Sequence, residues 1–124
     1  DLDTLAYYSN YGQSGIDFGA PGGDFELVFS NAAAFFSYCY VENTGDLCGW
    51  FDWVLSLNDD SYEWAVGTSM AAPHAAGIAA LIISENGGDM HPSQVRAQLS
   101  QRSDDLGKPG KDPAYGNGRV HSGY

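Results

Sequence analysis

The stretch Gly67-Thr68-Ser69-Met70-Ala71-Ala72-Pro73-His74 decides how this chain is interpreted. It places one hydroxyl nucleophile, Ser69, at the start of a predicted helix over residues 69–84, in which His74 is the only ionisable side chain. A helix that is apolar all round is typical of burial in a sizeable domain, so we expect this helix and His74 to be buried. Ser69 would lie beside unpaired backbone N–H groups, in the positive field of the helix dipole. These features favour a serine that attacks a carbonyl in acyl transfer.

A second helix is predicted over residues 92–101. Pro92 suits the first helical position, and His91 takes the N-cap place before it. Val95 and Leu99 are four residues apart and are expected to face the core. The polar residues expected to face water are Arg96, Gln98 and Arg102.

The other segments suggest strands and turns. Residues 1–30 form a strand-and-turn segment, with short strands expected over 16–20 and 25–29. Residues 31–61 hold both cysteines and are expected to be an irregular loop that ends in a turn. Residues 115–124 are expected to form a terminal strand after a glycine turn. The mixture of helices and strands predicts an α/β protein.

The chain is acidic, with 16 Asp and Glu against five Lys and Arg and a net charge of −11 over 124 residues. Nucleic acids and anionic membranes attract basic surfaces, so neither is expected as a partner. The acids are scattered along the chain, which favours a solvated surface. The longest apolar run, residues 75–83, is too short to cross a bilayer. The opening Asp1-Leu2-Asp3 reads like the interior of a longer protein.

The two cysteines, Cys39 and Cys48, favour a local disulfide over free buried thiols. Their segment contains no histidine that would help bind zinc, and their spacing is not that of a Cys-x-x-Cys redox motif. Disulfides persist in oxidising compartments, so the sequence predicts a secreted, extracellular protein.

The octet around Ser69 resembles the nucleophile motif of the subtilisin-like serine proteases, the subtilases. Residues 8–12 (YSNYG) and 16–22 (IDFGAPG) are similar to the family segment "FSNYG…VDIxAPG". Residues 92–96 (PSQVR) and 115–120 (YGNGRV) resemble its C-terminal helix and its final "YGxGxV" strand. The chain therefore resembles the C-terminal part of a subtilase catalytic domain, whose fold is α/β with a mostly parallel sheet and a buried nucleophile helix.

The resemblance implies a serine endopeptidase that acts on polypeptides through an acyl-enzyme on Ser69. Support for the nucleophile motif is expected from Gly67, Thr68 and Met70, and Ala65 and Val66 are expected on the leaving-group side. The family order of the triad is Asp, His, Ser, so its Asp and His, and the oxyanion-hole Asn, are expected upstream of Asp1. The chain alone is expected to be inactive until an upstream portion of the same protease completes it. No cofactor is required, although the family suggests structural calcium.

Other catalytic arrangements fit Ser69 poorly. His74 would point about 140° away from it on the helix, because each residue turns about 100°. His91 suits a helix cap and His121 the terminal strand, so no histidine of this chain is expected to act as the base. The fifth position of Gly67-Thr68-Ser69-Met70-Ala71 is not glycine, which excludes the α/β-hydrolase nucleophile motif. A non-catalytic subtilase fold that acts as a binding or scaffolding module remains the alternative function.

Overall fold

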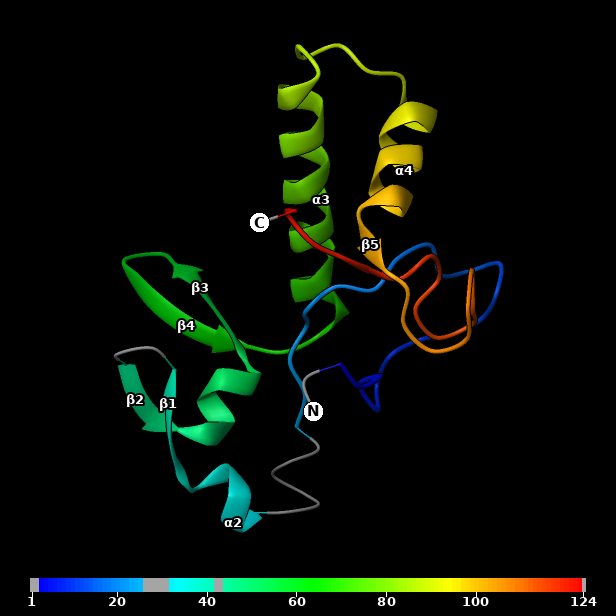
Figure 1. Cartoon of the computed structure of the whole chain (residues 1–124). Helices are drawn as coiled ribbons and strands as arrows, with labels where there is room; N and C mark the ends of the chain where they lie inside the picture. Colours follow the sequence, from blue (N-terminus) through cyan, green and yellow to red (C-terminus); the bar gives the residue numbers. More distant parts are fainter. Residues whose placement is uncertain (1–2, 26–31, 42–43, 124) are drawn as a thin grey trace. The chain divides into compact units, whose positions relative to one another are not determined.

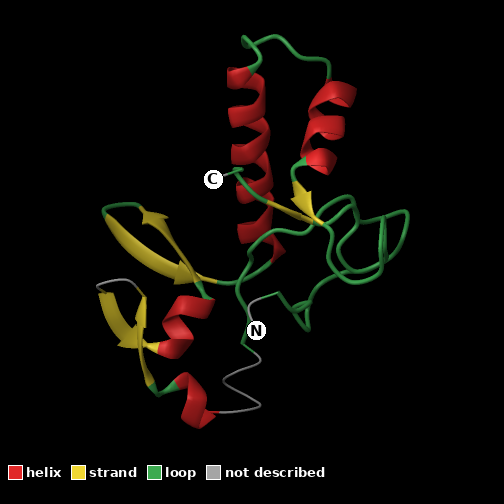
Figure 2. Cartoon of the chain, viewed as in Figure 1, coloured by secondary structure: helices red, strands yellow, loops and turns green. Residues whose placement is uncertain are grey.

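The computed structural model describes residues 3–25, 32–41 and 44–123, and the chain divides into two compact units. Unit 1 consists of Asp1–Ser9 and Gly22–Met70, and unit 2 consists of Asn10–Pro21 and Ala71–Tyr124. Short hairpins and a 3-10 helix belong to unit 1, whereas unit 2 holds most of the long helix and a second helix (Figure 1 and Figure 2). Among the described residues, no helix is long and apolar enough to cross a membrane.

Unit 1 is built from two antiparallel hairpins, in which β1 pairs with β2 and β3 with β4. Its elements are α2 (Ala32–Phe35), β1 (Tyr38–Val41), β2 (Thr44–Leu47), η1 (Cys48–Asp52), β3 (Val54–Asn58) and β4 (Ser61–Ala65). The prediction of an irregular loop over residues 31–61 is therefore wrong, although a turn does lie at 59–60. The strand predicted over 25–29 falls almost wholly outside the described residues.

A disulfide and an aromatic cluster hold unit 1 together. Cys39 in β1 and Cys48 at the start of η1 form a disulfide with a Cα–Cα distance of 4.8 Å, which confirms that prediction. The ring of Trp50 lies 5.0 Å from that of Trp53 and 5.7 Å from that of Trp64, measured between centroids. Large aromatic side chains bury much apolar area, so this half-buried cluster contributes to the packing of unit 1.

The two predicted helices are present. α3 (Thr68–Glu85) begins in unit 1 and continues through unit 2, and α4 (Pro92–Gln101) follows it (Figure 1). His91 caps α4. Its ring Nδ1 accepts the backbone N–H of Ser93 at 3.3 Å, and its backbone N–H donates to Gln94 Oε1 at 2.9 Å. This reciprocal capping box satisfies N–H groups that the first turn leaves unpaired.

The core of unit 2 is formed by Ile82, Leu99 and Val120. Half-buried Val95 packs against it, so the predicted inward positions of α4 are confirmed. Two short strands, β5 (Ser103–Asp104) and β6 (Arg119–Val120), form an antiparallel pair beside it. The terminal strand that was predicted over residues 115–124 is thus limited to Arg119–Val120. The strand expected over 16–20 is reduced to isolated bridges, Phe18 with Gly116 and Gly19 with Arg119.

Two expectations differ from the structure of the described residues. The sheets are small and antiparallel, and a parallel pairing occurs in the isolated bridge of Gly19 and Arg119. The helix is not buried all round, because His74 and Leu81 are exposed while Ile82 is fully buried. The residues of α3 that pack on the unit 2 core are Ala75, Ile78, Ala79 and Ile82. This spacing occupies a single stripe of a helix, which leaves the rest of its apolar surface exposed.

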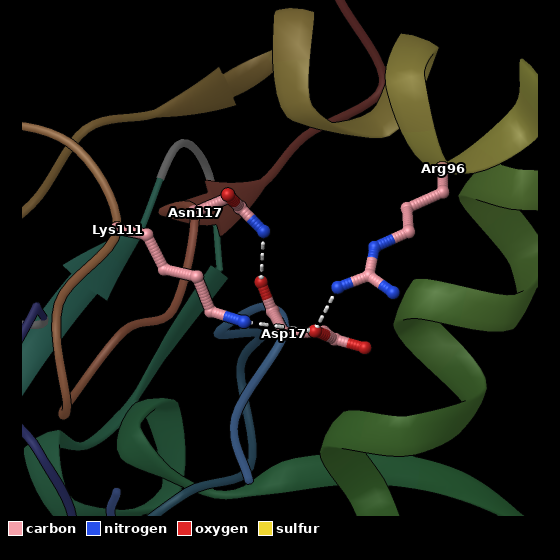
Figure 3. Close-up of polar contacts among 4 residues, drawn as sticks. All are labelled: Asp17, Arg96, Lys111 and Asn117. Atoms are coloured by element: carbon pink, nitrogen blue, oxygen red, sulfur yellow. Dashed lines mark hydrogen bonds and ion pairs between the residues drawn. The ribbon is translucent and has the colours of Figure 1, made fainter. Parts of the chain in front are cut away.

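Asp17 joins three segments of unit 2 that lie far apart in the sequence (Figure 3). Its carboxylate pairs with Arg96 of α4 and, at 3.2 Å, with Lys111. Its carbonyl oxygen accepts the backbone N–H of Asn117 at 2.8 Å and the Asn117 side-chain amide at 2.9 Å. The ion pairs are about half exposed and so contribute little to stability. The bonds to the Asp17 carbonyl are the ones that fix the segment before Pro21.

Candidate active site

Ser69 is the second residue of α3, and its side chain is exposed. Gly67 precedes the helix with a φ of +143°, a conformation that favours glycine. Its carbonyl oxygen accepts the N–H of Met70 at 2.9 Å, which closes the turn that carries Ser69. Pro73 lies inside the helix and has no N–H to offer the Ser69 carbonyl. The nucleophile predicted from sequence is therefore exposed to solvent on the first turn of α3, and that turn lacks the hydrogen bond that residue 73 would otherwise donate.

The turn before Ser69 is tied to a loop formed by Gly22–Asp24, called here the anchor loop. The N–H of Gly67 donates to the Gly22 carbonyl oxygen at 2.8 Å. The hydroxyl of Tyr8 donates to the same oxygen at 3.2 Å and also bonds to the Gly23 carbonyl. The Trp53 indole N–H donates to the Asp24 carbonyl at 3.0 Å. Three segments of unit 1, those of Tyr8, Trp53 and Gly67, therefore converge on the anchor loop, and the last of them leads directly to Ser69.

Gly23 has no room for a side chain. Its φ is +72°, and a Cβ there would lie 2.7 Å from Val66 Cγ1 and 3.0 Å from the Asp52 carbonyl oxygen. Val66 thus packs against bare backbone, and Val66 and Ala65 are both half-buried. Their predicted place on the leaving-group side stays a prediction, but their position is fixed by the anchor loop. The other motif residues differ in exposure, because Thr68 is exposed and Met70 half-buried.

Burial and negative charge perturb two groups beside the anchor loop. Burial raises the pKa of the Tyr8 phenol, the charge of Asp24 raises it further, and a hydrogen bond with the Gly67 backbone offsets part of the shift. Burial also raises the pKa of Asp52, again with a contribution from Asp24. The Tyr8 phenol therefore stays protonated at neutral pH and remains a hydrogen-bond donor to the anchor loop.

The three histidines lie in different local surroundings. His91 is held in the capping box of α4. His121 accepts the Gly123 N–H on Nδ1 at 3.0 Å, and its Nε2 lies 3.7 Å from Asp104 Oδ1. The expectation that His74 is buried is wrong, because the α3 stripe that contacts the core does not include position 74. That no histidine of this chain acts on Ser69 stays a prediction.

Carboxylates, histidines and cysteines are the side chains that could hold a metal ion. In the part of the chain that the structure describes, no three His, Cys, Asp or Glu side chains lie close enough together to hold a metal ion. Calcium prefers carboxylate-rich sites, and the structural calcium that the family suggests stays a prediction. The function proposed below uses no metal.

Tyr8 is the supporting residue that sequence reasoning missed. The family segment quoted above has Phe at this position, whereas this chain has Tyr and so adds one hydroxyl. A phenol that is partly buried, as that of Tyr8 is, usually has a hydrogen-bond partner, and that tendency was the available signal. The structure shows that the partners are the two carbonyls of the anchor loop.

Comparisons with known proteins relate this chain to serine proteases. The model of the subtilase family matches residues 1–118. A thermostable alkaline protease of Halalkalibacterium halodurans is 46% identical over 61 residues, which cover 46% of this chain and 15% of that protein. A thermophilic serine proteinase of Bacillus sp. strain AK1 is 29% identical over 97% of this chain and 21% of its own length. The crystal structure of a lanthipeptide protease matches with a TM-score of 0.66 and 33% identity, covering 94% of this chain and 35% of that one.

The chain thus spans between 15% and 35% of the length of these relatives. The family match extends over nearly the whole chain and includes both Ser69 and the anchor loop. These findings, together with a serine on the first turn of α3, identify the chain as a member of the subtilase family.

Proposed function

We propose that this chain is the nucleophile-bearing part of a secreted serine endopeptidase, with Ser69 as the nucleophile. The observation that carries the proposal is the placement of an exposed Ser69 on the first turn of α3, next to a glycine turn tied to the anchor loop. The relatives named above are proteases, and a protease acts on polypeptide chains. Secretion is supported by the disulfide of Cys39 and Cys48, because such bonds persist in oxidising compartments.

In the proposed reaction, Ser69 Oγ attacks the scissile carbonyl carbon while a histidine removes its proton. The negative charge moves to the carbonyl oxygen, where the Ser69 backbone N–H and the N-terminal end of α3 stabilise it. The same histidine then gives its proton to the leaving amine, and an acyl-enzyme on Ser69 remains. Water completes the hydrolysis by the reverse sequence of proton transfers.

The histidine base, its aspartate partner and an oxyanion-hole asparagine would come from an upstream portion of the same protease. This step is supported by the small share of its relatives that the chain covers and by the Asp, His, Ser order of the family triad. The same upstream portion would supply a parallel sheet and cover the apolar side of α3 that is exposed here, including Leu81. Burial of the nucleophile helix is therefore part of the proposal.

The chain alone should be nearly inactive. In subtilisin itself, removal of a triad member leaves an acceleration of only about 10³ to 10⁴ over water. Loss of the asparagine donor costs a further factor of about 10² to 10³ in the same enzyme. The 124-residue chain, which lacks the triad histidine, the triad aspartate and the asparagine donor, should therefore hydrolyse no peptide at a measurable rate.

Labelling with a fluorophosphonate tests the proposal, because an activated serine attacks the phosphorus of this reagent, displaces fluoride and becomes phosphonylated. The whole protease should be labelled on Ser69, whereas Ser69→Ala should not. The matched control is Ser84→Ala, which changes an exposed serine elsewhere on α3 and should leave labelling intact. The 124-residue chain alone should take up no label. An unlabelled but folded whole protein would instead support a non-catalytic binding module, and rapid labelling of the chain alone would show that no upstream base is needed.

A further inference from the structure

Charge is divided unevenly between the two units. Every Lys, Arg and His residue of the chain belongs to unit 2, namely His74, His91, Arg96, Arg102, Lys108, Lys111, Arg119 and His121. Unit 1 has only acidic residues among its charged side chains, namely Asp1, Asp3, Asp24, Glu26, Glu42, Asp46, Asp52, Asp59, Asp60 and Glu63. Unit 1 therefore carries a strong negative field at neutral pH, which attracts cationic partners and repels anionic ones.

The β3–β4 hairpin of unit 1 has one apolar face. Leu55 lies opposite Trp64 in the register and Leu57 lies opposite Tyr62, so these four side chains share a face. The other face is apolar at Val54 and Ala65 but polar toward the turn, where the Asn58 amide donates to Glu63 Oε2 at 2.6 Å. At its inner end the apolar face is covered by contact of Trp64 with Trp50.

The outer end of that face is exposed. The exposed fractions are 50% for Leu55, 77% for Leu57 and 72% for Tyr62. Beside them, the turn of the hairpin carries two exposed carboxylates, Asp59 and Asp60. An apolar patch rimmed by charge is typical of a surface that binds another polypeptide.

We propose that Leu55, Leu57 and Tyr62, with the acidic turn at Asp59 and Asp60, form a docking surface for a cationic polypeptide segment that also carries apolar side chains. Apolar residues of that segment would cover the exposed face, and its Lys or Arg side chains would pair with the acidic turn. Charge complementarity favours this occupant. A second copy of the chain would bring the same negative unit, and nucleic acid would be repelled.

The position of the hairpin connects this surface to catalysis, and this step rests on the proposed function. β4 ends at Ala65, four residues before Ser69. Tyr62 and Ser69 are seven positions apart, so their backbones are separated by at most about 25 Å. The docked segment would therefore belong to the substrate itself, on the leaving-group side and several residues from the scissile bond. The proposed substrates are thus polypeptides with a basic, apolar stretch after the cleavage site.

Direct binding tests the surface without relying on catalysis. The probe is a fluorescent 15-residue peptide of alternating Leu and Lys, added to the chain and to the whole protease, each carrying Ser69→Ala to prevent cleavage. Fluorescence anisotropy should show binding that weakens at least tenfold between about 50 and 500 mM NaCl, because salt screens the charges. A peptide with Glu in place of Lys should bind at least tenfold more weakly than the Lys peptide.

Variants locate the binding site. The pair Leu57→Ser and Tyr62→Ser should weaken binding at least tenfold, and Asp59→Asn with Asp60→Asn should reduce its salt dependence. In the 124-residue chain, Leu81→Ser is the control, because Leu81 is an exposed leucine on α3, away from the hairpin, and this variant should bind the peptide as the parent does. Unchanged binding by the Leu57 and Tyr62 variant, or equal binding of the Glu peptide, would overturn the proposal.

Another occupant would give a different result. If the upstream portion of the protease covers this face, the Leu57 and Tyr62 variant would lower the melting temperature of the whole protease. The cationic peptide would then bind only the 124-residue chain, and the proposal would be wrong. Ser69 labelling is independent of all these readouts, so failure of the docking surface and failure of the catalytic assignment can be told apart.

Discussion

The amide N–H of Gly67 donates a 2.8 Å hydrogen bond to the carbonyl oxygen of Gly22. This bond connects the turn that carries Ser69 to a segment 45 positions earlier in the sequence. The Tyr8 hydroxyl donates to the same carbonyl oxygen. The position of Ser69 therefore depends on the anchor loop, and changes in that loop should affect the nucleophile without touching it.

Tyr8→Phe should slow the acylation of Ser69. The substitution removes the hydroxyl that bonds to Gly22 and Gly23, and a hydrogen bond of this kind contributes about 0.5–1.5 kcal/mol to stability. We expect a several-fold lower rate of fluorophosphonate labelling in the whole protease, because the turn at Gly67 is held less firmly. Tyr11→Phe, at an exposed tyrosine, is the control. Equal labelling rates for both variants would show that Tyr8 does not position the nucleophile.

Gly23→Ala should destabilise the chain more than Gly88→Ala. Both glycines have positive φ values, +72° and +88°, so both substitutions cost about 1–2 kcal/mol in backbone strain. A Cβ at Gly88 meets open space, whereas one at Gly23 would collide with Val66. Crowding of this kind adds about 1–3 kcal/mol. Urea unfolding of the two variants measures the difference, and equal losses would mean that the anchor loop adjusts easily.

Gly77→Ala should change the unfolding free energy differently in the 124-residue chain and in the whole protease. A Cβ at Gly77 meets no atom within 4 Å, and glycine in a helix is less stable than alanine by about 0.5–1 kcal/mol. The substitution should therefore raise the unfolding free energy of the 124-residue chain by that amount. In the whole protease the proposed upstream portion covers α3, so the added methyl should bring no gain or a loss. The same stabilisation in both proteins would argue against a covered α3.

Peroxide should inactivate the whole protease through Met70. This side chain adjoins Ser69 and is half-buried, so a sulfoxide there would crowd the turn at Gly67. Met90, which packs against the core of unit 2, is the internal comparison. Peptidase activity should fall in step with Met70 oxidation, which peptide mapping measures. The Met70→Leu variant should keep its activity under the same treatment. Full activity after complete oxidation of Met70 would refute this expectation.

The helices and the disulfide were predictable because their signals are local. Pro92 and His91 mark the start of α4, and the apolar run after Ser69 marks α3. The β3–β4 hairpin was missed, although Leu55, Leu57, Tyr62 and Trp64 alternate with polar residues around an Asp59–Asp60 turn. That period of two is a strand signal, and the cysteines and aromatics of the segment obscured it.

Burial was less predictable than secondary structure, because it depends on what packs against an element. The composition of α3 indicates a helix that is apolar all round, but it does not show which side meets the core. In the structure, contact is made through a stripe that includes Ala75 and Ile82, and His74 is left exposed. The site residue Ser69 was identified from its motif, whereas the role of Tyr8 required the fold to bring it to Gly22.

The substitution Asp104→Asn should lower the melting temperature at neutral pH but should have little effect on it in acid. The hydrogen bond from Arg119 at 2.6 Å, with the charges of His121 and Arg119, lowers the pKa of Asp104 from its ordinary 3.8. A lowered folded-state pKa contributes stability above pH 3.8, and the contribution disappears as the pH falls through the folded-state value. The variant and parent should therefore converge in melting temperature at low pH. Asp89→Asn, at an exposed aspartate of the same unit, is the control, and a difference that persists in acid would contradict this assignment.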